Sequence, residues 1–180
     1  KRRVVDLSIY PRTRDYLERH RDKLESRKYI IDGGREWYEI WVPQDPLAWD
    51  QPKLVFRDIS EKPEFWIDLD KSVVNGDCYW LVCKNPEQTD LLWLACAVAN
   101  STFIESFYDH SFNNKLYAGR RRFMTQYVEQ FPLPDIDNIN SKKIIKKSKE
   151  IYMCIPSPEA DVLQLELDKL VWNAFGLIFE

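Results

Sequence analysis

The chain has 180 residues, of which 44% are hydrophobic and 31% are charged, so it can build an apolar core and is not disordered by composition. No uninterrupted apolar run approaches the ~18 residues of a membrane-spanning helix, and the start shows no signal-peptide pattern. We therefore expect no membrane association and a cytoplasmic location. Because the chain begins at Lys1 rather than Met, we also expect a piece of a longer protein.

Charge is distributed unevenly along the chain, although the net charge is only −3. Residues 1–30 carry a net charge of +5 and residues 112–149 carry +6, whereas residues 31–111 carry −9 and residues 150–180 carry −5. If folding brings the two basic segments to one face, that face suits a polyanion. The alternative is that each basic segment is only the solvated face of a helix.

The first predicted elements are a basic helix over residues 12–27 and two strands. Tyr10, Leu17 and Leu24 recur every seven residues, which predicts one apolar stripe on the helix. Residues 36–42 carry large side chains on both alternating faces, which predicts a strand that is covered on both sides. Residues 53–59 predict the next strand, with an apolar centre.

The middle of the chain reads as two further strands and a buried helix. Residues 63–69 and 78–84 predict strands, and Asn75-Gly76 between them is a hairpin turn signal. Thr89 or Asp90 is a candidate N-cap for a helix over residues 91–109, which is apolar nearly all round at its start and therefore buried.

The last third predicts a polar loop followed by a helical hairpin. Residues 111–122 form the loop, and residues 123–131 predict a short strand and a helical turn. Helices over 141–154 and 160–175 are separated by Pro156-Ser157-Pro158. The expected fold is α+β: a mixed β-sheet domain flanked by helices over residues 1–137, and a C-terminal helical hairpin over residues 138–180.

The chain lacks the motifs of several enzyme classes. The five glycines form no GxG pattern, which excludes a dinucleotide fingerprint and a Walker A loop. The acid-x-Lys core of metal-dependent nucleases is absent, and Asn85-Pro86 lacks the Pro-aromatic continuation that amino-methyltransferases use on a flipped base. The four cysteines and two histidines lack zinc-site spacing, so we expect reduced, mostly buried thiols. The sequence therefore predicts no catalytic and no metal-binding residues.

The order of several local patterns is similar to that of one known family. In chain order they are Tyr10-Pro11 before a basic helix, Trp37-Tyr38-Glu39-Ile40, Asp45-Pro46, Trp49, residues 52–60, Pro63-Glu64-Phe65, Asp77-Cys78-Tyr79, Ala99-Asn100-Ser101, residues 127–134, residues 167–171 and Phe175-Gly176-Leu177. Together they resemble the TaqI-like C-terminal specificity domain, the target recognition module of bacterial N6-adenine DNA methyltransferases and of fused restriction–modification enzymes. Many relatives carry a basic residue where this chain has Gln44, so no particular base contact is transferred.

The resemblance implies a function in DNA recognition. The chain would bind a short duplex sequence and position its adenine for a separate N-terminal methyltransferase domain of the same chain, with or without a fused endonuclease. S-adenosylmethionine would belong to that missing domain, and this piece would hold no cofactor and no enzyme activity of its own.

Candidate DNA contacts follow from the chemistry of recognition. The planar fork of arginine pairs with guanine O6 and N7 or clasps a phosphate, and asparagine pairs with adenine N6 and N7. The candidates are Arg35, Lys53, Arg57, Asn113, Asn114, Lys115, Arg120, Arg121 and Arg122.

Each candidate also has a structural interpretation. The arginine run is a solvated turn in that interpretation, the two asparagines form a turn, and Lys53 and Arg57 face water. Trp37, Tyr38 and Trp41 offer rings for base stacking, although core packing is the favoured interpretation. Further candidates for phosphate contacts lie on the first helix and on the first helix of the hairpin: Arg14, Arg19, Arg21, Arg27, Lys28, Lys142, Lys143, Lys146, Lys147 and Lys149.

Two rival functions stay open. The first is an interaction module, in which the helical hairpin binds a partner protein without direct DNA binding. The second is a nuclease or another enzyme whose site the sequence does not reveal.

Overall fold

The computed structural model describes residues 3–41, 45–74, 76–113 and 115–179, so Gln44, Asn75 and Asn114 lie outside the described residues. The chain forms two compact units, Lys1–Asp45 and Pro46–Glu180. The boundary that we predicted between residues 137 and 138 falls inside the second unit. There the hairpin shares one hydrophobic core with the sheet.

The first unit consists of short helices followed by turns. It contains the 3-10 helix η1 (Leu7–Ile9) and the helices α1 (Pro11–Glu18), α2 (Arg21–Glu25) and α3 (Lys28–Asp32), so the single helix predicted over residues 12–27 is broken around His20. The strand predicted over residues 36–42 is wrong, because the described residues 36–41 form turns. Trp37 is buried instead of pairing in a sheet, with its carbonyl accepting a hydrogen bond from Arg27 at 2.7 Å and the guanidinium of Arg21 lying 4.8 Å from its ring centre.

The second unit is built around a three-stranded antiparallel sheet. The central strand β1 (Lys53–Arg57) pairs with β3 (Phe65–Asp68) on one side and with β4 (Cys78–Val82) on the other. The hairpin predicted between β3 and β4 is therefore wrong, since these two strands lie at opposite edges of the sheet and do not pair with each other. β1 is central because its Leu54, Val55 and Phe56 are all nearly inaccessible to solvent, which requires neighbours on every side.

A short second ladder extends from this sheet. The strand predicted over residues 53–59 ends at Arg57, and β2 (Ile59–Ser60) pairs instead with β5 (Arg121–Arg122). This pairing joins the end of the predicted polar loop to the strand region, although more than sixty positions separate the two segments in the sequence.

Two helices replace the single one predicted over residues 91–109. α5 (Thr89–Ala99) and α6 (Thr102–Ser111) are bent by 70° at Asn100-Ser101. Ser101 starts the second helix because its hydroxyl accepts a hydrogen bond from the Ile104 N–H at 3.2 Å. Within the described residues, no single helix is long and apolar enough to cross a membrane, and α5 and α6 meet that test only as a bent pair.

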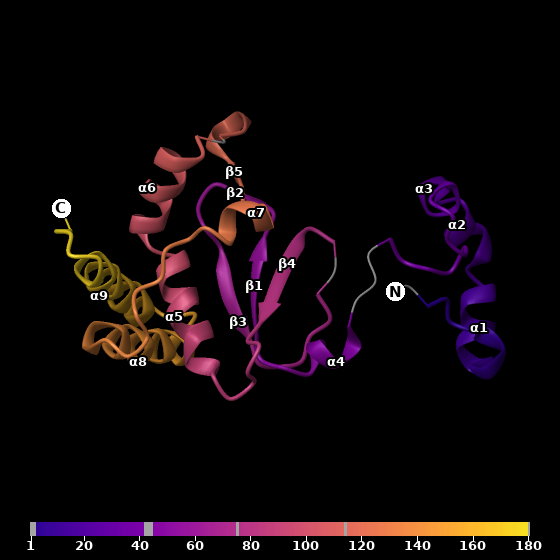
Figure 1. The fold of residues 1–180 in the computed structure, drawn as a ribbon, viewed down its shortest axis with the longest axis horizontal. Helices are drawn as coiled ribbons and strands as arrows, with labels where there is room; N and C mark the ends of the chain where they lie inside the picture. Colours follow the sequence, from indigo (N-terminus) through magenta and orange to yellow (C-terminus); the bar gives the residue numbers. More distant parts are fainter. Residues whose placement is uncertain (1–2, 42–44, 75, 114, 180) are drawn as a thin grey trace. The chain divides into compact units, whose positions relative to one another are not determined.

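The remaining elements complete an α+β fold, which confirms the predicted class. They are α4 (Pro46–Trp49), the 3-10 helix η2 (Tyr117–Gly119), α7 (Thr125–Val128), α8 (Ile139–Cys154) and α9 (Pro158–Ala174). α5 lies between the sheet and the α8–α9 hairpin (Figure 1). The core joins Phe56 of the sheet, Leu94 of α5, Ile144 of α8 and Val171 of α9.

The four cysteines are free thiols, and each is half-buried. Burial raises the pKa of the Cys96 thiol to about 12, against the opposing effect of a hydrogen bond from Asn100. A thiol in this state is unreactive.

Candidate nucleic-acid interface

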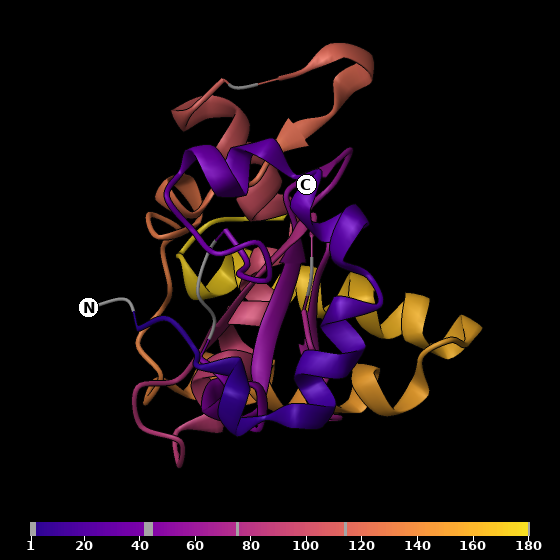
Figure 2. The ribbon, with the colours of Figure 1, turned by 90° about the vertical axis from the view of Figure 1, so that its right-hand side faces the viewer.

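The segment between α6 and β5, residues 112–120, forms a closed loop, which we call the basic loop. Asn113, Ala118 and Gly119 have φ angles of 44°, 57° and 71°, a left-handed conformation that asparagine and glycine tolerate well. The Leu116 N–H donates to the Arg120 carbonyl at 2.7 Å and closes the loop. Figures 1 and 2 both show this segment at the top of the second unit, beyond α6 and β5.

Arg120 lies at the end of this loop and is exposed. Its guanidinium lies 5.9 Å from the ring centre of Tyr117, which is itself 80% exposed. Among the described residues, no carboxylate forms an ion pair with Arg120. This guanidinium therefore keeps its hydrogen-bond donors for an external acceptor.

Arg121 begins β5 and faces inward, whereas Arg122 faces the other side, because successive residues of a strand face opposite sides. It is only 6% exposed and forms a double ion pair with Asp109 of α6, with Nε–Oδ1 and Nη2–Oδ2 distances of 2.7 Å. Its Nη2 also lies 2.9 Å from Oε1 of Glu105, and its Nη1 donates to the Glu61 carbonyl. The hydrogen bond from Arg121 lowers the pKa of Asp109 to about 2 against the effect of burial, and the same bond raises the pKa of Arg121.

Two other basic side chains near the loop have acidic partners. Lys115 lies 2.8 Å from Oδ2 of Asp109, and Arg122 lies 3.2 Å from Oδ1 of Asp58. Arg122 is half-exposed, and its hydrogen bond with Asp58 raises its pKa. Asn113 is exposed on the same loop. Asn113, Lys115 and Arg120 thus belong to one loop, and Arg122 lies on the strand that follows it.

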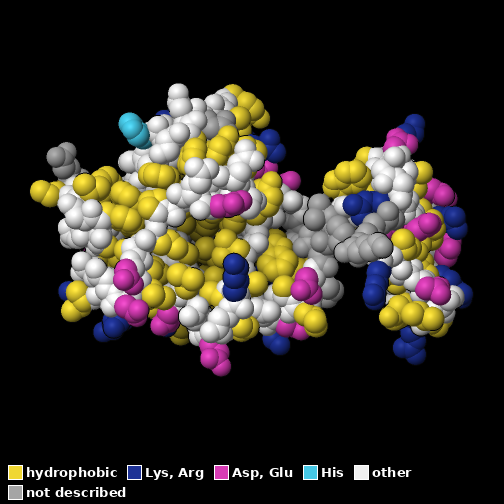
Figure 3. Space-filling view, in the orientation of Figure 1, with side chains coloured by type: hydrophobic (Ala, Val, Ile, Leu, Met, Phe, Trp, Pro, Cys, Tyr) yellow, Lys and Arg dark blue, Asp and Glu magenta, His cyan; other side chains and the backbone are white. Residues whose placement is uncertain are grey.

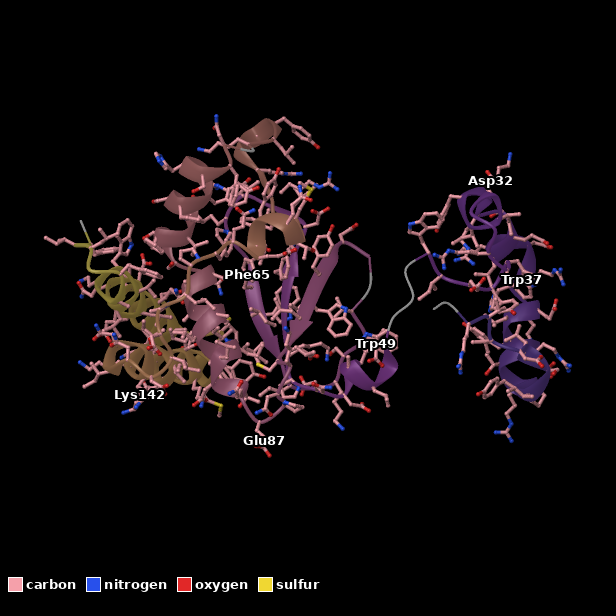
Figure 4. The ribbon with its side chains drawn as sticks, viewed as in Figure 1. Asp32, Trp37, Trp49, Phe65, Glu87 and Lys142 are labelled. Carbon is pink, nitrogen blue, oxygen red and sulfur yellow. The ribbon has the colours of Figure 1, made fainter. Side chains whose placement is uncertain are left out.

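Lys53 and Arg57 lie at opposite ends of β1. Lys53 is 0% exposed: its ammonium lies 2.5 Å from Oδ2 of Asp68 and donates to the Trp49 carbonyl at 2.8 Å. Burial alone would raise the pKa of Asp68, but hydrogen bonds from Lys53 and Ser72 outweigh burial and lower it. Trp49 lies on α4 beside the sheet (Figure 4). We therefore leave Lys53 out of the candidate interface.

Arg57 and Arg35 are accessible but already engaged. Nη1 of Arg57 lies 3.0 Å from Oε2 of Glu64 in a surface ion pair. Arg35 belongs to the first unit, where it donates to the Ile40 carbonyl at 3.3 Å and lies 5.1 Å from the ring centre of Trp41. A Cβ at Gly33 would lie 2.6 Å from the Trp41 ring, so this glycine allows the ring to approach the backbone.

The lysines of the hairpin divide into two groups. Nζ of Lys147 lies 2.8 Å from Oε2 of Glu166 and joins α8 to α9. Nζ of Lys149 lies 2.5 Å from Oδ1 of Asp90 and joins α8 to α5. Lys142 and Lys143 are exposed near the start of α8, where Figure 4 labels Lys142.

The second unit also contains an apolar pocket of about 430 Å³ between β4, α5 and residues 128–133. Its walls include Leu54, Phe65, Leu92 and Phe131, with Lys84 and Glu129 also lining it. Figure 3 shows hydrophobic side chains gathered over the middle of this unit. Most of its lining is apolar, and Gln88 joins Lys84 and Glu129 among its polar side chains, so it suits base edges less well than the basic loop does.

Comparison with known proteins decides the family. The family model described as "TaqI-like C-terminal specificity domain" matches residues 6–133, well over half of the chain. This chain belongs to the TaqI-like C-terminal specificity domain family. The resemblance predicted from the sequence is thereby confirmed.

Two curated relatives of this specificity domain are methyltransferases by name. "Type II methyltransferase M.BanIII" of Aneurinibacillus aneurinilyticus is 38% identical over 178 residues, which cover 98% of this chain and 31% of that protein. "Type II methyltransferase M.PaeR7I" of Pseudomonas aeruginosa is 24% identical over 131 residues, which cover 73% of this chain and 22% of that protein. The specificity domain thus spans a third or less of the length of either relative.

The family motif Ala99-Asn100-Ser101 has a clear structural role in this specificity domain. The Asn100 side chain accepts a hydrogen bond from the Phe65 N–H at 2.9 Å and donates to the Phe65 carbonyl at 2.7 Å, as a neighbouring strand would. β3 is an edge strand, so this asparagine covers an otherwise open edge.

Sequence reasoning missed the acidic partners of the basic run. Glu105 and Asp109 are four residues apart and therefore lie on one face of a helix, and Asp109 precedes the first of the three arginines by eleven positions. That spacing, together with the alternation of a strand, was the available signal that one arginine of the three faces inward.

Proposed function

We propose that this specificity domain recognises a short duplex DNA sequence for an adenine-N6 DNA methyltransferase. The observation that carries the proposal is the family match over residues 6–133, and both named relatives are methyltransferases. In this proposal the recognised duplex is positioned so that a separate N-terminal domain, which would bind S-adenosylmethionine, flips and methylates one adenine. We do not propose a fused endonuclease.

The basic loop is the part of the domain best suited to contact DNA. Arg120 is exposed and has no acidic partner among the described residues, and Asn113 of the same loop is also exposed. An arginine in this setting either pairs with a guanine edge or binds a phosphate. Arg122, Lys115 and Arg57 would contact phosphates only by exchanging their carboxylate partners, so we rank them below Arg120.

A selection experiment tests this function. The intact protein that contains this chain is incubated with duplexes that share fixed ends and a randomised centre, and the bound duplexes are sequenced. We expect enrichment of one short sequence, and transfer of a methyl group from S-adenosylmethionine to an adenine within it. Binding without any enrichment, or methylation of cytosine alone, would contradict the proposal.

A second candidate function is supported by the exposed apolar side chains of the hairpin. Met153 and Ile155 at the end of α8, and Val162 and Leu165 on α9, are largely exposed, as on a surface that binds another protein. Under this interaction function, replacing Met153 and Leu165 by serine abolishes assembly with a partner, and replacing Arg120 by alanine leaves DNA binding of the intact protein unchanged.

A further inference from the structure

The environment of Arg121 differs from that of its two neighbours in the basic run. Arg121 is buried, and its guanidinium contacts α6 through Glu105 and Asp109 and the segment after β2 through the Glu61 carbonyl. We propose that Arg121 is a positioning residue, which holds the basic loop in place from inside and does not itself touch DNA. The inference rests on the proposed function, which it deepens by separating the residue that reads DNA from the residue that places it.

The Arg121–Asp109 pair joins the two ends of the loop. Asp109 lies in the last turn of α6, just before the loop starts, and Arg121 follows directly after the loop ends. Lys115, within the loop, contacts the same carboxylate at 2.8 Å. One carboxylate thus fixes both ends and the middle of the loop, and the two parallel hydrogen bonds of the arginine fork fix its orientation as well as its distance.

The charges of this cluster balance internally. Arg121 and Lys115 contribute two positive charges, and Glu105 and Asp109 contribute two negative charges. The cluster therefore offers a phosphate little net attraction. If Arg121 turned outward, Glu105 would lose its ion pair with Arg121 and Asp109 would keep only the one with Lys115. Attraction to DNA at this loop is left to Arg120, whose neighbouring backbone the cluster holds.

Fixed placement matters because a base edge is read through hydrogen bonds of narrow geometry. A loop that must be ordered on binding loses affinity in proportion to the side chains and backbone that it immobilises. Holding the loop beforehand lowers this cost for the sequence that Arg120 fits. We call the ion pairs of Arg121 with Asp109 and Glu105 the clamp. The clamp therefore contributes to discrimination between DNA sequences more than to general attraction for DNA.

A first measurement tests the clamp without DNA. Amide hydrogen exchange is followed by mass spectrometry in the unaltered intact protein and in its Arg121→Lys and Asp109→Asn variants. We expect about tenfold faster exchange in the loop, including the Leu116 amide, with unchanged exchange in α8. Lys115→Ala, which removes the exposed ion pair with Asp109, should give a smaller increase in the exchange rate of the same peptides. An unchanged amide exchange rate in the basic loop of a folded Arg121→Lys variant would overturn the proposal that Arg121 holds the loop.

A second measurement distinguishes positioning from DNA contact. The duplex enriched by selection and a scrambled duplex of equal composition are titrated against the same variants at several salt concentrations. Positioning predicts that Arg121→Lys and Asp109→Asn both lower the ratio of specific to non-specific affinity by about tenfold, and that the salt slope of Arg121→Lys is unchanged.

Direct contact of Arg121 with DNA predicts the opposite response from Asp109→Asn. Freeing the guanidinium from its carboxylate would then strengthen specific binding, and that result would overturn the proposal. Lys169→Ala, which removes an exposed charge on α9, is the matched control and should leave the ratio unchanged. If the unaltered protein does not discriminate between the duplexes, the proposed function and the recognition role of Arg121 both fail, and loop exchange still decides whether Arg121 is a clamp.

Discussion

At the scale of single residues, the same side-chain type has different roles according to burial and partner. Arg120, Arg121 and Arg122 are consecutive, yet the first is exposed, the second is buried between carboxylates and the third is paired at the surface. The net charge of a segment therefore does not predict how many of its residues contact DNA. The number of cations without a protein partner is the better measure.

Arg120→Ala tests this distinction in DNA binding. If Arg120 binds a phosphate, the variant should weaken binding to all duplexes alike and reduce the salt slope by about one unit. If it reads a guanine, the variant should cost about 1–3 kcal/mol on the selected duplex and relax specificity at one position. Salt-dependent titration of the intact protein separates the two results, with Lys169→Ala as the control. An unchanged affinity and slope would exclude Arg120 from the interface.

Lys53 should behave as a structural residue. Removing one partner of a buried ion pair leaves the other charge unpaired, so Lys53→Met should lower the free energy of unfolding by about 3–5 kcal/mol. The double variant Lys53→Met with Asp68→Leu removes both charges and should recover most of that loss. Chemical denaturation of the single and double variants measures both. Loss of DNA affinity in a double variant of normal stability would instead point to a direct role for Lys53.

At the scale of elements, a few side chains join segments that are distant in the sequence. Asn100 connects the end of α5 to the edge of β3, and Asp168 of α9 accepts hydrogen bonds from the N–H and the hydroxyl of Thr102 at the start of α6. The hairpin thus fixes α6, and α6 carries Asp109, which holds the basic loop. Packing on the hairpin is therefore relevant to the geometry of the interface.

Asn100→Ala should destabilise the second unit by about 1–3 kcal/mol. The substitution leaves the N–H and carbonyl of Phe65 without the partners that they have in the native edge. Thermal and chemical unfolding of the variant measure the effect. Replacing the exposed Asn173 of α9 by alanine serves as the control and should change stability much less. Equal losses in the two variants would contradict the assigned role of Asn100.

Acid should weaken the clamp between α6 and β5. The pKa of Asp109 is about 2 in the folded protein, below its ordinary value near 4, so folding is favoured by the ionised form. The contribution of Asp109 to stability is complete above pH 4 and is lost as the pH falls toward 2. The stability difference between the unaltered protein and Asp109→Asn should therefore shrink over this interval. A difference that stays constant with pH would show that Asp109 is not preferentially ionised in the fold.

Local sequence patterns predicted most of the individual strands and helices of the second unit. The strands near residues 53–59, 63–69 and 78–84, and both helices of the hairpin, were predicted because alternation, apolar stripes and prolines are local signals. The break at Asn100-Ser101 was missed, since it depends on an asparagine that binds β3. The strand order and the burial of Lys53 and Arg121 were missed for the same reason, because their partners lie on other elements.

At the scale of the whole molecule, the chain corresponds to one domain of the longer proteins to which it is similar. It belongs to a specificity-domain family and spans a third or less of two methyltransferases by length. Its second unit holds a hydrophobic core, an apolar pocket and a loop that presents a guanidinium without an acidic partner among the described residues. In our proposal these features serve recognition, and methyl transfer belongs to a separate domain.

Photo-crosslinking tests the central claim, DNA contact through the basic loop, most directly. A photoreactive phenylalanine analogue is placed at Tyr117, the exposed neighbour of Arg120, in the intact protein bound to the selected duplex, and at Leu165 on α9 as a matched exposed control. The account predicts a covalent adduct with DNA from position 117, competed by excess unlabelled selected duplex, and little adduct from position 165. Adducts of equal yield at both positions, or none at position 117 while the duplex is bound, would contradict it.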